Sequence, residues 1–184
     1  GLGYGCGVKK FGQVASALTG GKLNLSASEA RSQVYNYRKQ NPKIPDLWKR
    51  IEDYVRDRIP ETDGEVVTVE TRANTPIRYF DVEDKEGELS GRTVKGGPRK
   101  KLYGGLLTEN LIQATARDVF AEALLKAEAA GLEILLHVHD SLTVEVEESR
   151  GSETLELITR TLSSPPVWAE GLPLAAEGEV KGHY

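Results

Sequence analysis

Hydrophobic and polar residues alternate along residues 132–147, on both sides of a short polar break. The apolar positions of this alternation are Ile134, Leu136, Val138, Leu142, Val144 and Val146. A period of two is typical of a strand with one buried face, and two such runs separated by about two polar residues predict an antiparallel hairpin. The break is Asp140-Ser141, and Asp tolerates the backbone angles of a tight turn. We therefore expect Asp140 at the exposed tip of a hairpin.

Elsewhere in the chain, apolar residues recur at the spacing of helices. The predicted helices cover residues 9–18, 27–41, 46–59, 107–130 and 153–162. Ser26 or Ser28 is the expected N-cap of the second helix. Pro45 and Pro60 are expected to bound the third helix, and Gly131 to end the fourth.

Between residues 64 and 82 the period changes to two, which predicts strands over residues 66–69 and 77–82. The long fourth helix leads directly into the hairpin. Its apolar stripe is expected to cover the face formed by Ile134, Val138 and Val144. The predicted fold class is therefore α+β.

The chain has 184 residues, of which 39% are hydrophobic, enough to build one domain or two small lobes with a real core. Its net charge of -4 conceals a gradient. Residues 1–60 carry 11 Lys and Arg against 5 Asp and Glu, or +6, and residues 61–184 carry 13 against 23, or -10. This asymmetry is typical of a protein that presents a basic surface to a polyanion, although solubility alone also accounts for it.

Several classes of protein are disfavoured. No apolar run approaches the roughly 20 residues that span a bilayer, and the N-terminus lacks the order of a signal peptide, so we expect a cytoplasmic protein with no membrane partner. Cys6 is the single cysteine, which excludes an internal disulfide and a cysteine-based zinc site. The chain has no Met, even at its start, and we interpret it as a piece of a longer protein.

A basic segment lies at residues 92–101. Its cations are Arg92, Lys95, Arg99, Lys100 and Lys101, beside Gly96-Gly97-Pro98 and with no acid among them. The segment is therefore expected to be unable to neutralise itself. A flexible basic loop is a natural phosphate contact, and a plain exposed loop is the alternative interpretation.

Asp140 is the main candidate for chemistry, because a carboxylate held at the rigid end of two strands is well placed to bind a hard cation. A solvated turn is the alternative. His137 and His139, at i and i+2, with Asp140 also suggest a zinc-dependent hydrolase. That hypothesis lacks ligands, since His183 is the one remaining histidine and catalytic zinc usually needs three protein ligands. A non-catalytic nucleic-acid-binding module, built on the basic first third and residues 92–101, is a further alternative.

Four motifs occur in a known order. They are Tyr4-Gly5, residues 108–116 (Thr-Glu-Asn-Leu-Ile-Gln-Ala-Thr-Ala), Val138-His139-Asp140 and the tail of residues 168–178. In that order they resemble the end of the fingers helix, the palm helix, the palm Val-His-Asp-Glu hairpin and the C-terminus of family A DNA polymerases. That family is the group of bacterial DNA polymerase I, here in the version encoded by many bacteriophages. The resemblance covers nearly the whole chain.

The resemblance implies that residues 1–104 form the distal, mostly helical portion of the fingers and residues 105–184 the C-terminal portion of the palm. Asp140 would be one of two catalytic aspartates that bind two Mg2+ ions, and His139 would shape the site near the primer end. Gln113 would contact the primer-template, and Tyr4 would stack near the nascent base pair. The basic residues Arg99, Lys100 and Lys101 are the candidate DNA contacts of the loop.

The resemblance also implies missing parts. The second aspartate and the fingers Lys and Arg that grip the triphosphate would lie upstream of Gly1. The chain would therefore be inactive alone and would need the upstream part of the same polymerase, with primer-template DNA and deoxynucleoside triphosphates as its other partners. Ser141 stands where most relatives have Glu, and Ala114 where bacterial relatives often have Gly.

Plainer interpretations of the same residues remain open. Gln113 would be an exposed helix residue bonded to Arg117, and Tyr4 an aromatic packed on Phe11. His137 is expected to be structural. The tryptophans Trp48 and Trp168 are expected in the core or at lobe contacts.

Overall fold

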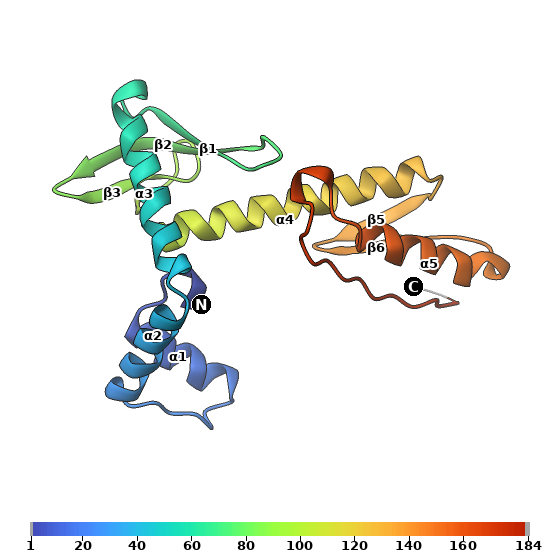
Figure 1. Ribbon diagram of the computed structural model, residues 1–184, viewed down its shortest axis with the longest axis horizontal. Coiled ribbons are helices and arrows are strands. Elements are labelled where there is room, and N and C mark those ends of the chain that lie inside the picture. Colours follow the sequence, from blue (N-terminus) through green and yellow to red (C-terminus); the bar gives the residue numbers. More distant parts are fainter. Residues whose placement is uncertain (1, 183–184) are drawn as a thin grey trace. The chain divides into compact units, whose positions relative to one another are not determined.

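The structure is a computed structural model that describes residues 2–182 (Figure 1). It divides into two compact units. The first unit comprises Gly1–Thr71 and Pro76–Gln113, and the second comprises Arg72–Thr75 and Ala114–Tyr184. The predicted α+β class is confirmed, because helices and antiparallel sheets are both present. In the described part of the chain, no helix is long and apolar enough to cross a membrane.

The first unit begins with the short 3-10 helix η1 (Leu2–Tyr4), which the sequence does not predict. Three helices follow near the predicted positions, α1 (Val8–Leu18), α2 (Ala27–Gln40) and α3 (Lys43–Thr62). Ser26 is the N-cap of α2, and its side chain and that of Glu29 form a reciprocal capping box. Glu29 lies in the first turn, where a negative charge is also favourable.

Helix α3 is longer than predicted at both ends. Pro45 does not precede the helix but lies in its first turn. No N–H group of a first turn has an acceptor within the helix, so proline loses no hydrogen bond there. Pro60 lies in the last turn, where it removes a single hydrogen bond. The helix ends at Thr62, and its C-cap, Asp63, has a left-handed φ of 52°. The predicted start was wrong because a proline is tolerated in the first turn of a helix. The predicted end was wrong because the helix continues through Pro60 despite the lost hydrogen bond.

A four-stranded antiparallel sheet follows, in the order β1-β2-β3-β4. The strands are β1 (Val66–Glu70), β2 (Pro76–Lys85), β3 (Glu88–Arg92) and β4 (Lys100–Lys101). One core joins this sheet to α3 and to the start of α4; its members are Ile51, Val55, Val67, Val69, Tyr79, Val82, Leu89, Leu102 and Leu107. The first two strands confirm the prediction. The description of residues 1–104 as mostly helical was incomplete, since β3 and β4 complete a sheet.

Helix α4 (Gly104–Ala129) starts in the first unit and continues into the second. The division between the units falls after Gln113, nine residues beyond the predicted division after residue 104 (113 − 104 = 9). The names fingers and palm for the two parts stay a prediction.

The start of α4 is closely packed against two other segments of the first unit. A Cβ atom on Gly104 would lie 2.4 Å from the Cβ of Trp48, and one on Gly105 would lie 2.2 Å from the carbonyl oxygen of Tyr4. Trp48 donates a hydrogen bond from Nε1 to the carbonyl of Gly3 at 3.0 Å. Only glycine allows this approach, because any side chain would overlap backbone atoms.

A carboxylate from another helix caps α4. Glu52 of α3 accepts a hydrogen bond from the N–H of Gly104, one of the amides that no intrahelical carbonyl can satisfy. Arg56 in turn pairs with Glu52 at 3.2 Å, with Asp53 at 3.3 Å and with Asp84 of β2 at 2.8 Å. This network joins α3, the sheet and the start of α4.

The second unit contains the predicted hairpin. Strands β5 (Ile134–Val138) and β6 (Ser141–Val144) pair antiparallel, with Val138 opposite Ser141. The remaining elements are η2 (Glu148–Arg150), α5 (Gly151–Leu162) and η3 (Val167–Ala169). The C-terminal tail then runs along α5 (Figure 1), where the N–H of Ala176 donates to Ser163 Oγ at 3.1 Å.

The apolar face of the hairpin differs from the prediction. Val138 is 51% exposed and is not covered by α4. Instead, His137 meets Phe120 of α4, with ring centroids 6.1 Å apart and ring planes at 63°. The pairing register shifts between Ile134 and Leu136, and such an irregularity breaks the simple alternation of faces.

Candidate functional site

The hairpin tip is a two-residue turn made of His139 and Asp140. Asp140 is exposed there, as predicted. The left-handed position, however, belongs to His139, with a φ of 56°. The hydroxyl of Ser141 closes the turn by donating to the carbonyl of Val138 at 2.8 Å. Paired strands on both sides therefore hold the backbone of Asp140 in place while its carboxylate is open to solvent.

Asp140 supplies one carboxylate to a possible metal site. Within residues 2–182, no group of three or more His, Cys, Asp or Glu side chains is arranged to hold a metal ion. Mg2+ prefers several oxygen ligands, and a pair of Mg2+ ions needs shared anions between them. The described residues therefore do not fit a two-metal site by themselves.

The same finding bears on the zinc hypothesis. His137 lies in β5 and is exposed, with its ring edge-to-face with that of Phe120, and its structural role stays a prediction. His139 lies in the turn, and the two histidines with Asp140 do not form a metal-binding group in the described part of the chain. His183 lies outside the described residues.

Tyr4 ends the short helix η1 and lies beside the start of α4. Its neighbour Gly5 has a φ of 75°, and a Cβ atom there would lie 3.3 Å from the ring of Tyr103. Among the residues that the structure describes, Tyr4 and Phe11 make no ring contact. The backbone of Tyr4 is thus a packing element, and the role of its ring stays a prediction.

Gln113 lies on α4 and is exposed. In residues 2–182 the structure shows no hydrogen bond between it and Arg117, so the plainer interpretation of Gln113 is wrong in this respect. Three residues earlier, Asn110 donates to the hydroxyl of Tyr79 at 3.0 Å. Burial raises the pKa of Tyr79, and the hydrogen bond from Asn110 opposes part of that rise.

The basic segment is not the free loop that the sequence predicts. Arg92 pairs with Asp81 at 2.6 Å, and Arg99 pairs with Glu83 at 2.9 Å. Lys101 pairs with Glu88, which lies on the neighbouring strand. Antiparallel pairing brings these carboxylates alongside the cations from outside the ten-residue window. The segment does not neutralise itself, as predicted, but carboxylates outside it pair with three of its five cations.

The cations of this segment differ in whether a carboxylate pairs with them. A hydrogen bond from Lys85, followed by the charges of Arg99 and Lys85, holds the pKa of Glu83 below its usual value. Lys95 and Lys100 are exposed, and neither has an ion pair in the described part of the chain. Of the three candidate DNA contacts in the segment, Lys100 is thus the available cation.

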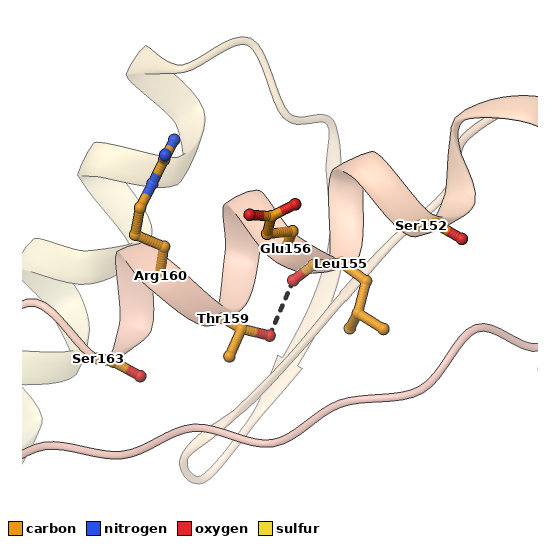
Figure 2. Close-up of a pocket in the computed structure, with 6 residues that line it drawn as sticks. All are labelled: Ser152, Leu155, Glu156, Thr159, Arg160 and Ser163. Atoms are coloured by element: carbon orange, nitrogen blue, oxygen red, sulfur yellow. Dashed lines mark hydrogen bonds between the residues drawn. The ribbon is translucent and has the colours of Figure 1, made fainter.

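A pocket of about 440 Å3 lies along one face of α5 (Figure 2). Its lining residues are Ser152, Leu155, Glu156, Thr159, Arg160 and Ser163. The hydroxyl of Thr159 donates to the carbonyl of Leu155 at 2.8 Å, so that hydroxyl is already bonded within the helix. The pocket contains none of the residues that the sequence singled out.

Two curated proteins are similar to the chain over most of its length. The DNA polymerase of Bacillus phage SP02 is 28% identical over 207 residues, covering 95% of this chain and 32% of that protein. DNA polymerase I of Helicobacter pylori is 27% identical over 168 residues, covering 89% of this chain and 16% of that protein. The chain fits a fragment of a family A DNA polymerase.

The chain spans about a third or less of the length of these curated relatives. No family model matches it, and no solved structure matches it. The candidate site residues that the sequence singled out lie in both units. Tyr4, Lys100 and Gln113 belong to the first, and His139 and Asp140 to the second.

Some residues that join segments of the chain gave no signal in the sequence. Glu52 looks like one of many helix-surface acids, and its bond to Gly104 joins residues 52 positions apart. Asn110 likewise finds Tyr79 at a separation of 31 residues. The two tryptophans are half-buried and not in the core, where one alternative placed them. Trp168 donates from Nε1 to Glu122 at 2.9 Å and Trp48 donates to the carbonyl of Gly3, each within its own unit.

Proposed function

We propose that this chain is the C-terminal part of a DNA-directed DNA polymerase, which adds deoxynucleotides to a primer 3′ end as a template directs. The observation that carries the proposal is the exposed Asp140 at the tip of an antiparallel hairpin, in the sequence Val138-His139-Asp140. The similarity to two curated DNA polymerases over about nine-tenths of the chain supports it.

In this proposal Asp140 is one of two metal-binding aspartates of the complete enzyme. The Mg2+ ions, when bound, would neutralise charge on the transferred phosphoryl group and on the attacking and leaving oxygens. The hairpin's contribution is to hold the backbone of Asp140 in place, because β5, β6 and the Ser141 hydroxyl restrain the turn. The other carboxylate would come from the upstream part of the same polymerase.

The remaining roles concern substrates. His139 would shape the primer end, Gln113 would contact the primer-template and Tyr4 would lie near the incoming nucleotide. The exposure of Gln113 leaves its amide available for such a contact. To contact a DNA phosphate, Arg99 would have to leave Glu83 and Lys101 would have to leave Glu88. Lys100 has no such ion pair to break in the described residues.

The decisive experiment uses the complete polymerase that contains this chain. Asp140→Asn is expected to abolish primer extension and to leave DNA affinity nearly unchanged, because it removes a metal ligand and no cation. Glu133→Gln is the matched control, since Glu133 is exposed just before β5 and its loss removes the same charge. Extension by the Asp140→Asn enzyme within tenfold of the parent would refute the assignment.

The chain alone is expected to bind DNA at low salt and to be unable to extend a primer, because one carboxylate cannot hold two cations. Extension by the isolated chain that depends on Asp140 would place the second ligand within these residues.

A non-catalytic nucleic-acid-binding module is the second candidate. It is supported by the charge of the first 60 residues, 11 cations against 5 acids. This second candidate would be favoured if the complete protein binds DNA equally well without metal and does not extend a primer.

A further inference from the structure

The exposed positive charge is concentrated in the first 50 residues. This stretch carries nine Lys and Arg against two Asp and Glu, a net charge of +7 (9 − 2 = 7). Seven of its cations are exposed and have no ion pair in residues 2–182; they are Lys9, Lys10, Lys22, Arg31, Lys39, Lys43 and Arg50. Residues 92–101 differ, because carboxylates of neighbouring strands pair with Arg92, Arg99 and Lys101. The more available polyanion surface is therefore the helical N-terminal part.

Within this part, α2 has one face with an aromatic ring between two cations. Arg31, Tyr35 and Lys39 occupy positions i, i+4 and i+8, and all three are exposed. Ala30 and Val34 of the same helix are buried, so α2 has a buried side and an exposed side. At a rise of about 1.5 Å per residue, the two cations lie about 6 Å on either side of the tyrosine along the helix axis.

Tyr35 is unusual on this face. It is 65% exposed, although a tyrosine ring normally buries most of its large apolar area. The acid of α2, Glu29, is occupied by the capping box with Ser26 at the start of the helix. No carboxylate therefore competes for Arg31 and Lys39 in the described residues.

We propose that this face of α2 binds single-stranded nucleic acid, with Tyr35 stacked on an unpaired base and Arg31 and Lys39 at the phosphates on either side. Single strands present free base faces, and proteins hold them by alternating aromatic rings with cations along a groove or helix. A duplex offers phosphates but no open base face for a ring on an exposed helix. The identity of the strand rests on the function proposed above: in a polymerase, the ligand would be the unpaired template strand.

The test measures the affinity of the 184-residue chain for a fluorescein-labelled oligothymidylate and for a blunt hairpin duplex. Tyr35→Ala is expected to weaken binding to the single strand about 5- to 150-fold, which corresponds to the loss of one stacked base. Tyr35→Phe keeps the stacking surface and is expected to stay within about twofold of the parent. Because the ring is exposed, neither change should alter the fold, and circular dichroism checks this.

The cations are tested by the salt dependence of binding. Arg31→Gln combined with Lys39→Gln should lower the slope of log affinity against log salt by about 1.4, or about 0.7 for each phosphate contact on a single strand. Lys181→Gln is the control, because it also removes one positive charge but from the C-terminal tail, where Lys181 pairs with Glu179.

Three outcomes would overturn the proposal. They are unchanged single-strand affinity in Tyr35→Ala, an equal loss for the single strand and the duplex, and no binding of oligothymidylate by the parent chain. An equal loss would indicate phosphate contacts without stacking. Primer extension by the complete polymerase and its Asp140→Asn variant tests the proposed function separately, so the failure of one idea leaves the other distinguishable.

Discussion

Gly105→Ala is the substitution whose effect follows most directly from the structure. The new Cβ atom would lie 2.2 Å from the carbonyl oxygen of Tyr4, 2.5 Å from its carbonyl carbon and 2.9 Å from the nitrogen of Gly5. All three are backbone atoms, so no side chain can rotate away. Either α4 or the segment Leu2–Gly5 must move.

The expected cost is a loss of about 1–3 kcal/mol in the free energy of unfolding of the first unit, the range found for overpacked sites. The higher helix propensity of alanine, worth up to about 1 kcal/mol in a helix interior, acts in the opposite direction. It is smaller in the first turn, where the chain is not held by intrahelical bonds on both sides. The overlap therefore determines the sign.

Urea unfolding followed by tryptophan fluorescence measures this loss unit by unit. The chain has two tryptophans, Trp48 in the first unit and Trp168 in the second. In a Trp168→Phe background, Trp48 reports the first unit, and its indole bonds Gly3 within the segment that must move. The midpoint is expected to fall by about 1 M urea for a loss of about 2 kcal/mol.

Gly12→Ala is the matched control because the same change is made in an open helix position. On Gly12 of α1 the nearest atom to the new Cβ is the Cβ of Ala30, at 3.9 Å. That variant should be more stable than the parent by up to about 1 kcal/mol. If Gly105→Ala and Gly12→Ala shift the midpoint in the same direction, the close approach at the start of α4 is not as described.

Three further predictions concern individual contacts. Ser26→Ala should reduce the free energy of unfolding of the first unit by about 1 kcal/mol through loss of the capping box, and Ser28→Ala should have a smaller effect. Tyr79 has a raised pKa in the folded state, so its contribution is full below about pH 10 and is lost as the pH rises through the folded pKa. Tyr79→Phe should thus flatten the loss of stability measured by urea unfolding between neutral and strongly alkaline pH, and an equally steep loss would contradict this. Lys100→Gln should lower the salt slope of duplex binding by about 0.9, and Lys101→Gln by less because Glu88 already pairs with that lysine.

Much of the local structure could be predicted from the sequence, because it depends on neighbours a few residues apart. The hairpin over β5 and β6 follows from alternation, and the start of α2 follows from Ser26 and Glu29. The exposed position of Asp140 follows from the same local pattern. These features need no knowledge of which segments meet in space.

The features that were missed depend on distant segments. The carboxylates that pair with Arg99 and Lys101 come from β2 and β3. Val138 is exposed, and the pairing register of its strand shifts between Ile134 and Leu136, which the order of residues alone does not reveal. The same division applies to the candidate site. The hairpin tip is formed by neighbouring residues and could be predicted, whereas a partner of Asp140 from a distant segment could not.

The cap of α4 by Glu52 makes the first turn of that helix depend on a different helix. The Gly104 amide has its acceptor on α3, and the carboxylate also holds Arg56. An ordinary helix terminus frays, and its first amides exchange their protons with solvent quickly. Gly104 is buried, so its proton can exchange only when the Glu52 carboxylate releases it and water reaches the start of α4. Its exchange is therefore expected to be slower than that of an ordinary first-turn amide, and a single amide would report how firmly α3 holds the start of α4.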